Sequence, residues 1–109
     1  MRGSVVVHRD AKLKDLGGGV SRRVLAHNDA MMMVEVAFEA GGTGAVHQHP
    51  HVQCTYVVGG RFRFTIDGEA VEVKAGDSIA FPGDVPHGTS CLEAGTLIDV
   101  FTPMRADFL

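Results

Sequence analysis

The stretch of residues 54–81, CTYVVGGRFRFTIDGEAVEVKAGDSIAF, decides the fold of this chain. It contains short runs rich in Val, Ile, Phe and Tyr, and glycine and aspartate separate each run from the next. Such runs, bounded by turn residues, are typical of β-strands. Asp67-Gly68 tolerates the positive φ angles of a two-residue hairpin, so it predicts a tight turn between residues 61–66 and 69–73. Gly59-Gly60 is expected to join the preceding pair of strands, which makes all of these strands antiparallel neighbours.

The rest of the chain repeats this pattern, and hardly any window keeps the three- and four-residue apolar spacing of a helix. Strands are expected over residues 4–7, 20–26, 31–38, 54–58, 61–66, 70–73, 78–81 and 96–101. They follow one another about every ten residues, a spacing typical of sandwiches and barrels. An antiparallel chain of eight or more strands hides its edges by closing on itself. We therefore expect an all-β jelly-roll barrel whose mouth can hold a small ligand.

Length and composition narrow the possible functions. The 109 residues suit one domain, 1–109, and 45% apolar with 21% charged residues is ordinary for a folded globular chain. The net charge is −3 and no basic run exceeds Arg22-Arg23, which argues against a nucleic-acid partner. No apolar run reaches the length of a membrane span or a signal peptide, so a cytoplasmic location is expected. Cys54 and Cys91 are expected to stay reduced and buried.

The segment of residues 41–53, GGTGAVHQHPHVQ, carries the chemistry. His47, His49 and Gln53 are separated by even numbers of residues, so on an extended backbone their side chains leave one face and can converge. Imidazole nitrogens and an amide oxygen can bind a divalent metal ion. His87 follows a rigid proline-bounded turn and is the candidate for a third imidazole. Such a set leaves a position open for water or substrate, as catalytic metal sites do.

Alternatives stay open for these histidines. A His-x-His pair alone is more often an exposed or packed pair than a metal site. His51 shares the parity of its neighbours, but Pro50 disturbs the strand directly before it. A supporting or pocket role for His51 is therefore favoured over direct ligation.

The wider spacing resembles the two motifs of the cupin family. Residues 41–60 follow the order of the first motif: Gly41, five residues, His47-x-His49, three residues, Gln53, six residues and Gly60. Glutamine stands there where most members have glutamate. Residues 76–91 resemble the second motif through Gly76, Pro82 and His87, although Gly83-Asp84 departs from the usual Pro-x-Gly and Cys91 stands where Asn is frequent. The resemblance implies a double-stranded β-helix and one divalent metal ion, for which Zn, Ni, Mn, Fe and Co remain open.

A more specific resemblance runs over most of the chain. Residues 97–109, LIDVFTPMRADFL, together with residues 32–36 and 47–53, look like the small pectin-degradation cupins of the KdgF type. Members of that family open the ring of 4,5-unsaturated uronate monosaccharides, which pectin and alginate lyases release, to give linear 5-keto-4-deoxyuronate. The resemblance implies metal ligands and further site residues at these positions: His47, His49, Gln53 and His87, then Asp99, Phe101 and Arg105.

The residue types suggest roles for the last three. Alternation puts Leu97, Asp99 and Phe101 on one strand face, where an inward carboxylate beside a metal would serve as a proton shuttle. The alternative for Asp99 is a strand-end cap or a pair with an arginine. Arg105 would bind the carboxylate of a sugar-acid substrate in bidentate fashion, although a C-terminal arginine is more often solvated. Phe101 would line the pocket or belong to the core.

Two other functions compete with ring opening. One is an iron-dependent dioxygenase, and the other is a non-catalytic module that binds a metal or a sugar. For assembly, residues 31–33 (Met-Met-Met) suit strand packing or a subunit interface. Small jelly rolls commonly bury an exposed sheet by pairing, so a homodimer is expected.

Overall fold

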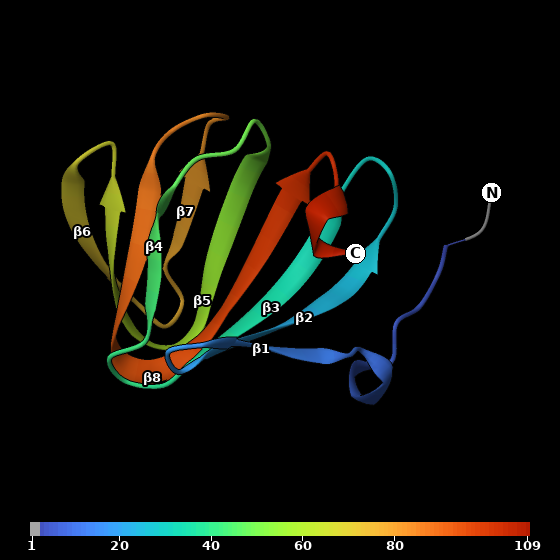
Figure 1. The fold of residues 1–109 in the computed structure, drawn as a ribbon, viewed down its shortest axis with the longest axis horizontal. Coiled ribbons are helices and arrows are strands. Elements are labelled where there is room, and N and C mark those ends of the chain that lie inside the picture. The colour runs from blue at the N-terminus through green and yellow to red at the C-terminus, as the bar shows by residue number, and fades with distance from the viewer. Residues whose placement is uncertain (1–2) are drawn as a thin grey trace.

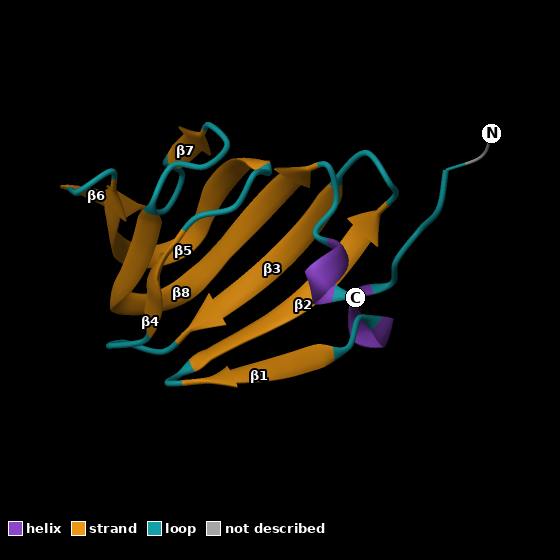
Figure 2. Cartoon of the chain, turned by 45° about the horizontal axis from the view of Figure 1, so that its top comes forward, coloured by secondary structure: helices purple, strands orange, loops and turns teal. Residues whose placement is uncertain are grey.

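The computed structural model describes residues 3–109, and within that range its regular elements are strands apart from two single 3₁₀ turns (Figures 1 and 2). This confirms the all-β prediction. In chain order the elements are η1 (His8–Asp10), β1 (Leu13–Gly17), β2 (Val20–His27), β3 (Met32–Phe38), β4 (Thr43–His47), β5 (Val52–Ile66), β6 (Glu69–Lys74), β7 (Ser78–Phe81), β8 (His87–Thr102) and η2 (Ala106–Phe108).

Two long antiparallel strands, β5 and β8, organise the sheet. They pair from Val52 opposite Thr102 to Ile66 opposite His87. The first half of β5 and the second half of β8 join β1, β2, β3 and β7, whereas their other halves join β4 and β6. Because both strands bend between the two groups, the sheet folds into two facing layers (Figure 1). This is the predicted jelly roll.

Closely packed glycines form the bend and correct one predicted turn. Gly60 has φ 87°, and a Cβ atom there would lie 2.6 Å from the carbonyl oxygen of Glu93. Residues Val52–Ile66 form one continuous strand, whose register against β8 shifts around Gly59 and Gly60. The predicted hairpin at Gly59-Gly60 is therefore wrong, because a glycine pair allows a bulge within one strand as readily as a turn between two.

The second predicted hairpin is confirmed. Asp67 and Gly68 have φ 49° and 83°, and Ile66 pairs with Glu69 on either side of them. Both central residues thus take the left-handed conformation that a tight hairpin turn requires.

The N-terminal third differs most from the prediction. Residues 4–7 are not a strand, and Val5 is 88% exposed, because β-branched residues form a strand only where a neighbouring strand pairs with them. Strands β1 and β4 were not predicted. Every residue of β1 is exposed, so it has no apolar alternation to reveal it. β4 lies in the glycine-rich segment before the histidines, where propensity is low.

The core lies between the layers and continues to the open end of the barrel. Phe62 and Phe64, on β5, are 0% and 1% exposed and belong to this core. A second cluster of Met32, Val34 and Phe101 packs beside the C-terminal turn η2. The core therefore fixes the backbone on which the candidate site is built.

Two further expectations concern the state of the cysteines and the presence of a membrane-spanning segment. Cys54 and Cys91 are free, as predicted, but only Cys91 is buried and Cys54 is exposed. Within residues 3–109 there is no helix with the length and apolar character to cross a membrane.

Candidate functional site

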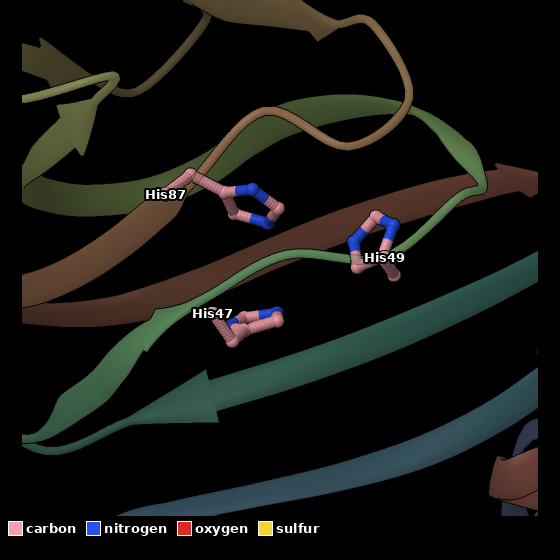
Figure 3. A group of neighbouring side chains, drawn as sticks. All are labelled: His47, His49 and His87. Atoms are coloured by element: carbon pink, nitrogen blue, oxygen red, sulfur yellow. The ribbon is translucent and has the colours of Figure 1, made fainter.

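Strand pairing brings the three predicted histidine ligands together. His47 ends β4 and pairs directly with His87, which begins β8. His49 follows in the loop between β4 and β5, and one nitrogen from each of the three rings lies within 4.8 Å of the others. Figure 3 shows the three rings converging on a shared space. Three imidazoles at this separation can hold one metal ion.

The route to this convergence differs from the predicted one. His47 and Gln53 lie on different strands, and His49 lies in the loop between them rather than on a shared extended face. The loop packs against the turn before β8: the backbone N–H of Asp84 donates to the His49 carbonyl at 2.7 Å. A Cβ atom on Gly83 would lie 2.5 Å from the carbonyl oxygen of Pro50, so the approach requires glycine there.

The same turn explains the departure from the second cupin motif. Asp84 has φ 61°, so it takes the left-handed conformation at the position where the motif has glycine. Aspartate is one of the few other residues that adopt this conformation. The turn therefore keeps its shape, and His87 is directed toward His47 despite the changed sequence.

Each ring is fixed by a bond from its Nδ1 atom to a backbone carbonyl. His47, His49 and His87 face the carbonyls of Ala45, His51 and Val85 at 2.9, 3.1 and 2.9 Å. With the Nδ1 proton placed on these bonds, each Nε2 atom keeps its lone pair for a ligand. This arrangement of supporting carbonyls is typical of histidines that bind metal.

Gln53 completes the set and tests whether a cation fits. Its Nε2 donates to Thr55 Oγ1 at 2.9 Å and to Asp99 Oδ1 at 3.3 Å, which directs Oε1 toward His49 Nε2 at 3.0 Å. Both nitrogens of His49 thus face oxygen acceptors, whereas a neutral imidazole has one N–H to donate. Protonation of His49 is disfavoured because burial and the nearby Arg105 lower its pKa. A metal ion between Nε2 and Oε1 would satisfy both atoms, so these residues fit a divalent cation.

Asp99 is connected to the histidine cluster through Gln53. The Thr55 hydroxyl donates to Asp99 Oδ1 at 2.6 Å, and Gln53 is its second partner. Burial raises the pKa of Asp99 to about 6, although both hydrogen bonds oppose this change. The alternatives of a strand-end cap or an arginine pair do not describe this residue. A carboxyl group with such a pKa can exchange protons near neutral pH.

A cavity of about 240 Å³ opens beside these residues and is largely apolar. His47, Gln53, His87 and Asp99 line it together with Phe101, whose ring centroid lies 5.6 Å from that of His49. Phe101 is 3% exposed, so it is both a pocket residue and a core residue. The cavity combines an apolar wall with a few polar side chains, which is the lining expected of a small-molecule site.

Arg105 also lines the cavity, but its guanidinium group already binds a carboxylate of this chain. It is 9% exposed rather than solvated, and its Nε and Nη2 atoms donate to the two carboxylate oxygens of Asp107 at 3.0 and 2.9 Å. Its guanidinium lies 4.3 Å from the ring centroid of Phe108. Two donors of Arg105 are therefore engaged within the C-terminal turn.

His51 holds that turn against the site. Its Nε2 atom lies 3.2 Å from the carbonyl oxygen of Met104, and its backbone carbonyl supports His49. The cluster of three nitrogens does not include it, and its Nδ1 atom is buried with no partner among the described residues. This placement agrees with a supporting role.

Three residues at the site were not predicted: Thr55, Arg22 and Phe108. Thr55 is two residues beyond Gln53 on one strand, so the alternation that was applied to the histidines would have found it. Arg22 alternates with the inward Val20 and Val24 in the same way. No sequence signal places Phe108, because a 3₁₀ turn carries it to the cavity.

Comparisons with known proteins agree with this architecture. The family model of the cupin domain matches residues 34–101. The pectin degradation protein KdgF of Dickeya dadantii (strain 3937) is 42% identical over 98 residues, which are 88% of this chain and 89% of that protein.

Solved structures give the same result. An RmlC-like cupin from Shewanella frigidimarina NCIMB 400 has a TM-score of 0.93 at 39% identity, covering 99% of this chain and 97% of that one. KdgF from a Halomonas species has a TM-score of 0.92 at 35% identity, covering 99% of this chain and 100% of that one. This chain belongs to the cupin family and, within it, to the KdgF-type cupins.

Proposed function

We propose that this protein opens the ring of 4,5-unsaturated uronate monosaccharides and yields linear 5-keto-4-deoxyuronate. The observation that carries the proposal is the bonded series His49, Gln53 and Asp99 beside a small cavity, in a chain 42% identical to a pectin degradation protein. This series joins Gln53, a candidate metal ligand, to a carboxyl group of raised pKa. The proposal covers sugar acids derived from pectin and from alginate.

The metal ligands in this proposal are His47, His49, Gln53 and His87. One divalent ion bound there would act as a Lewis acid on a substrate oxygen, a role that needs no change of redox state. The ring Nδ1 bonds to backbone carbonyls and the Gln53 bonds to Thr55 and Asp99 hold the four donor groups in place before an ion binds.

Asp99 moves the proton that the reaction transfers. Ring opening breaks the bond between C1 and the ring oxygen, and the C1 hydroxyl gives up its proton as the aldehyde forms. The ring oxygen leaves as an enolate at C5, which becomes a ketone when C4 gains a proton. Ionised Asp99 would accept the first proton and supply the second, so that the atoms balance without any co-reactant. Phe101 and Arg105 shape the wall around the sugar.

The decisive experiment uses metal-loaded protein and 4,5-unsaturated galacturonate. We expect the absorbance of its conjugated double bond to decay faster than in the spontaneous reaction. The matched variant is Asp99→Asn, which has nearly the same shape and should keep the metal by elemental analysis while losing the added rate. An absence of acceleration by the wild-type protein would refute ring opening. Oxygen consumption in the same cuvette would instead favour a dioxygenase.

We also propose that the chain forms a homodimer through the outer face of β3, β8 and β5. Met33, Val100 and Cys54 lie opposite one another across these strands, and Tyr56 is 50% exposed two residues beyond Cys54. An apolar sheet face of this kind is usually covered by a partner. Tyr56→Arg should give a monomer in sedimentation experiments, whereas Arg63→Glu on another strand segment should not.

The cytoplasmic location stays a prediction, testable by cell fractionation.

A further inference from the structure

Arg22 brings a second guanidinium group, besides that of Arg105, into the cavity beside the three histidines. It lies on β2 between the inward residues Val20 and Val24, and it lines the same cavity as His47 and Asp99. Its side chain is half-buried, and its guanidinium carbon lies 3.8 Å from the ring centroid of Phe108. The aromatic ring therefore holds the cation at a fixed place on the cavity wall.

The two arginines of the cavity differ in how many of their guanidinium N–H donors are already engaged in hydrogen bonds. Arg105 uses Nε and Nη2 on the carboxylate of Asp107. The guanidinium of Arg22 has no hydrogen-bond or ion-pair partner among residues 3–109. A partly desolvated guanidinium with free donors in an apolar cavity is an anion-binding group, and its planar fork matches a carboxylate.

Sheet geometry places Arg22 at a useful distance from the reacting end of the cavity. Arg22 pairs with Val36, which pairs with Leu97, and Asp99 lies two residues beyond Leu97 on the same face. Strand spacing of about 4.8 Å and a rise of about 3.4 Å per residue put the Cα atoms of Arg22 and Asp99 about 12 Å apart. Both side chains line the same cavity, whose volume of about 240 Å³ admits a single sugar acid.

We propose that Arg22 binds the carboxylate of the substrate and selects sugar acids over neutral sugars. This inference rests on the proposed function for the identity of the ligand, a hexuronate. It assigns to Arg22 the role that the sequence had suggested for Arg105, whose fork is held by Asp107. The sugar then lies across the cavity, with its carboxylate at β2 and its C1 hydroxyl toward the histidines and Asp99.

The test compares an acid with its neutral ester. Wild type, Arg22→Gln and Arg22→Lys are assayed in metal-loaded form with 4,5-unsaturated galacturonate and with its methyl ester. Loss of a charge-assisted bidentate contact should raise KM for the acid roughly 10- to 100-fold in Arg22→Gln, with a smaller rise in Arg22→Lys. KM for the ester should stay near the wild-type value. Arg63→Gln, which removes the same charge from an exposed site on β5, should leave both values unchanged.

Two results would overturn the assignment of Arg22. One is an unchanged KM for the acid, and the other is an equal loss on acid and ester, which would indicate that Arg22 only supports Phe108. The thermal unfolding midpoint of each variant separates misfolding from weakened binding.

A direct binding measurement keeps this test independent of turnover. If the wild type fails to accelerate ring opening, the proposed function fails, yet calorimetry with galacturonate still tests Arg22. Tighter binding of galacturonate to wild type than to Arg22→Gln, with no such difference for galactose, supports the inference. Equal dissociation constants for galacturonate refute it.

Discussion

Replacing Thr55 by valine tests the link between the buried hydroxyl and the proposed proton shuttle. Thr55 is 1% exposed, and its hydroxyl donates to Asp99 at 2.6 Å while it accepts from Gln53 at 2.9 Å. Valine has nearly the same shape, so Thr55→Val removes these contacts with little change of volume. Asp99 then keeps only the 3.3 Å bond from Gln53.

The size of the effect follows from these contacts. A hydrogen bond to an ionised group contributes roughly 1.5–3 kcal/mol. The Thr55 bond stabilises the ionised form of Asp99, so its loss favours the protonated form. At about 1.4 kcal/mol per pKa unit, the pKa of Asp99 should rise by about one to two units, from about 6 to roughly 7–8.

The assay is the pH dependence of kcat/KM. Because Asp99 acts first as a base, the rate falls as pH decreases through its pKa, and this acidic limb should move upward by about one to two pH units in Thr55→Val. At high pH the variant should regain most of its rate. Thr96→Val, on the opposite face of β8, is the matched control and should leave the limb in place. A limb that stays at the wild-type pH in Thr55→Val would refute the coupling.

Further predictions concern the metal and the backbone. Elemental analysis should find no bound metal in His87→Ala, whereas His27→Ala, at the exposed end of β2, should keep it. Metal affinity should decrease as the pH is lowered, because protons compete with the metal for the imidazole nitrogens. Burial lowers the pKa of His49 and His87, so the decrease should begin below roughly pH 6. If a chelator removes the metal no more easily at about pH 5 than at neutral pH, ligation by three histidines is contradicted. Asp84→Gly should raise the free energy of unfolding by about 1 kcal/mol in urea, because φ 61° strains a residue with a Cβ atom. Gly60→Ala should lower it by at least about 2 kcal/mol through the clash with the Glu93 carbonyl, and a neutral result would mean that the bend tolerates side chains.

The sequence predicted the elements that alternate in polarity and missed those that depend on their neighbours. β5 and β8 have clear inward and outward faces, so their inward-facing residues, Asp99 among them, could be predicted. β1 is exposed throughout and forms through its pairing with β2, which leaves no apolar pattern. Gly59-Gly60 was misassigned because the space beside Gly60 is filled by another part of the chain.

The site was predicted to a similar degree. The histidines were found from motif spacing, although His49 reaches the cluster through a loop packed on Gly83 rather than through strand parity. Arg22 was considered only as part of the short basic run Arg22-Arg23, and its parity with the inward valines was not used. The pairing of Arg105 with Asp107 depends on the backbone of η2, which short-range patterns do not encode.

The order of strands in the sheet separates two kinds of evolutionary freedom. β8, which carries His87 and Asp99, pairs with β3, β4 and β5 in the middle of the sheet, whereas β2 with Arg22 has only β1 between it and the edge. Elements near an edge open and tolerate change at lower free-energy cost than central ones. If Arg22 binds the ligand as proposed, substitutions on β2 can alter which ligand is accepted while β8 keeps its stability, so a new substrate preference can arise without changes at His87 and Asp99.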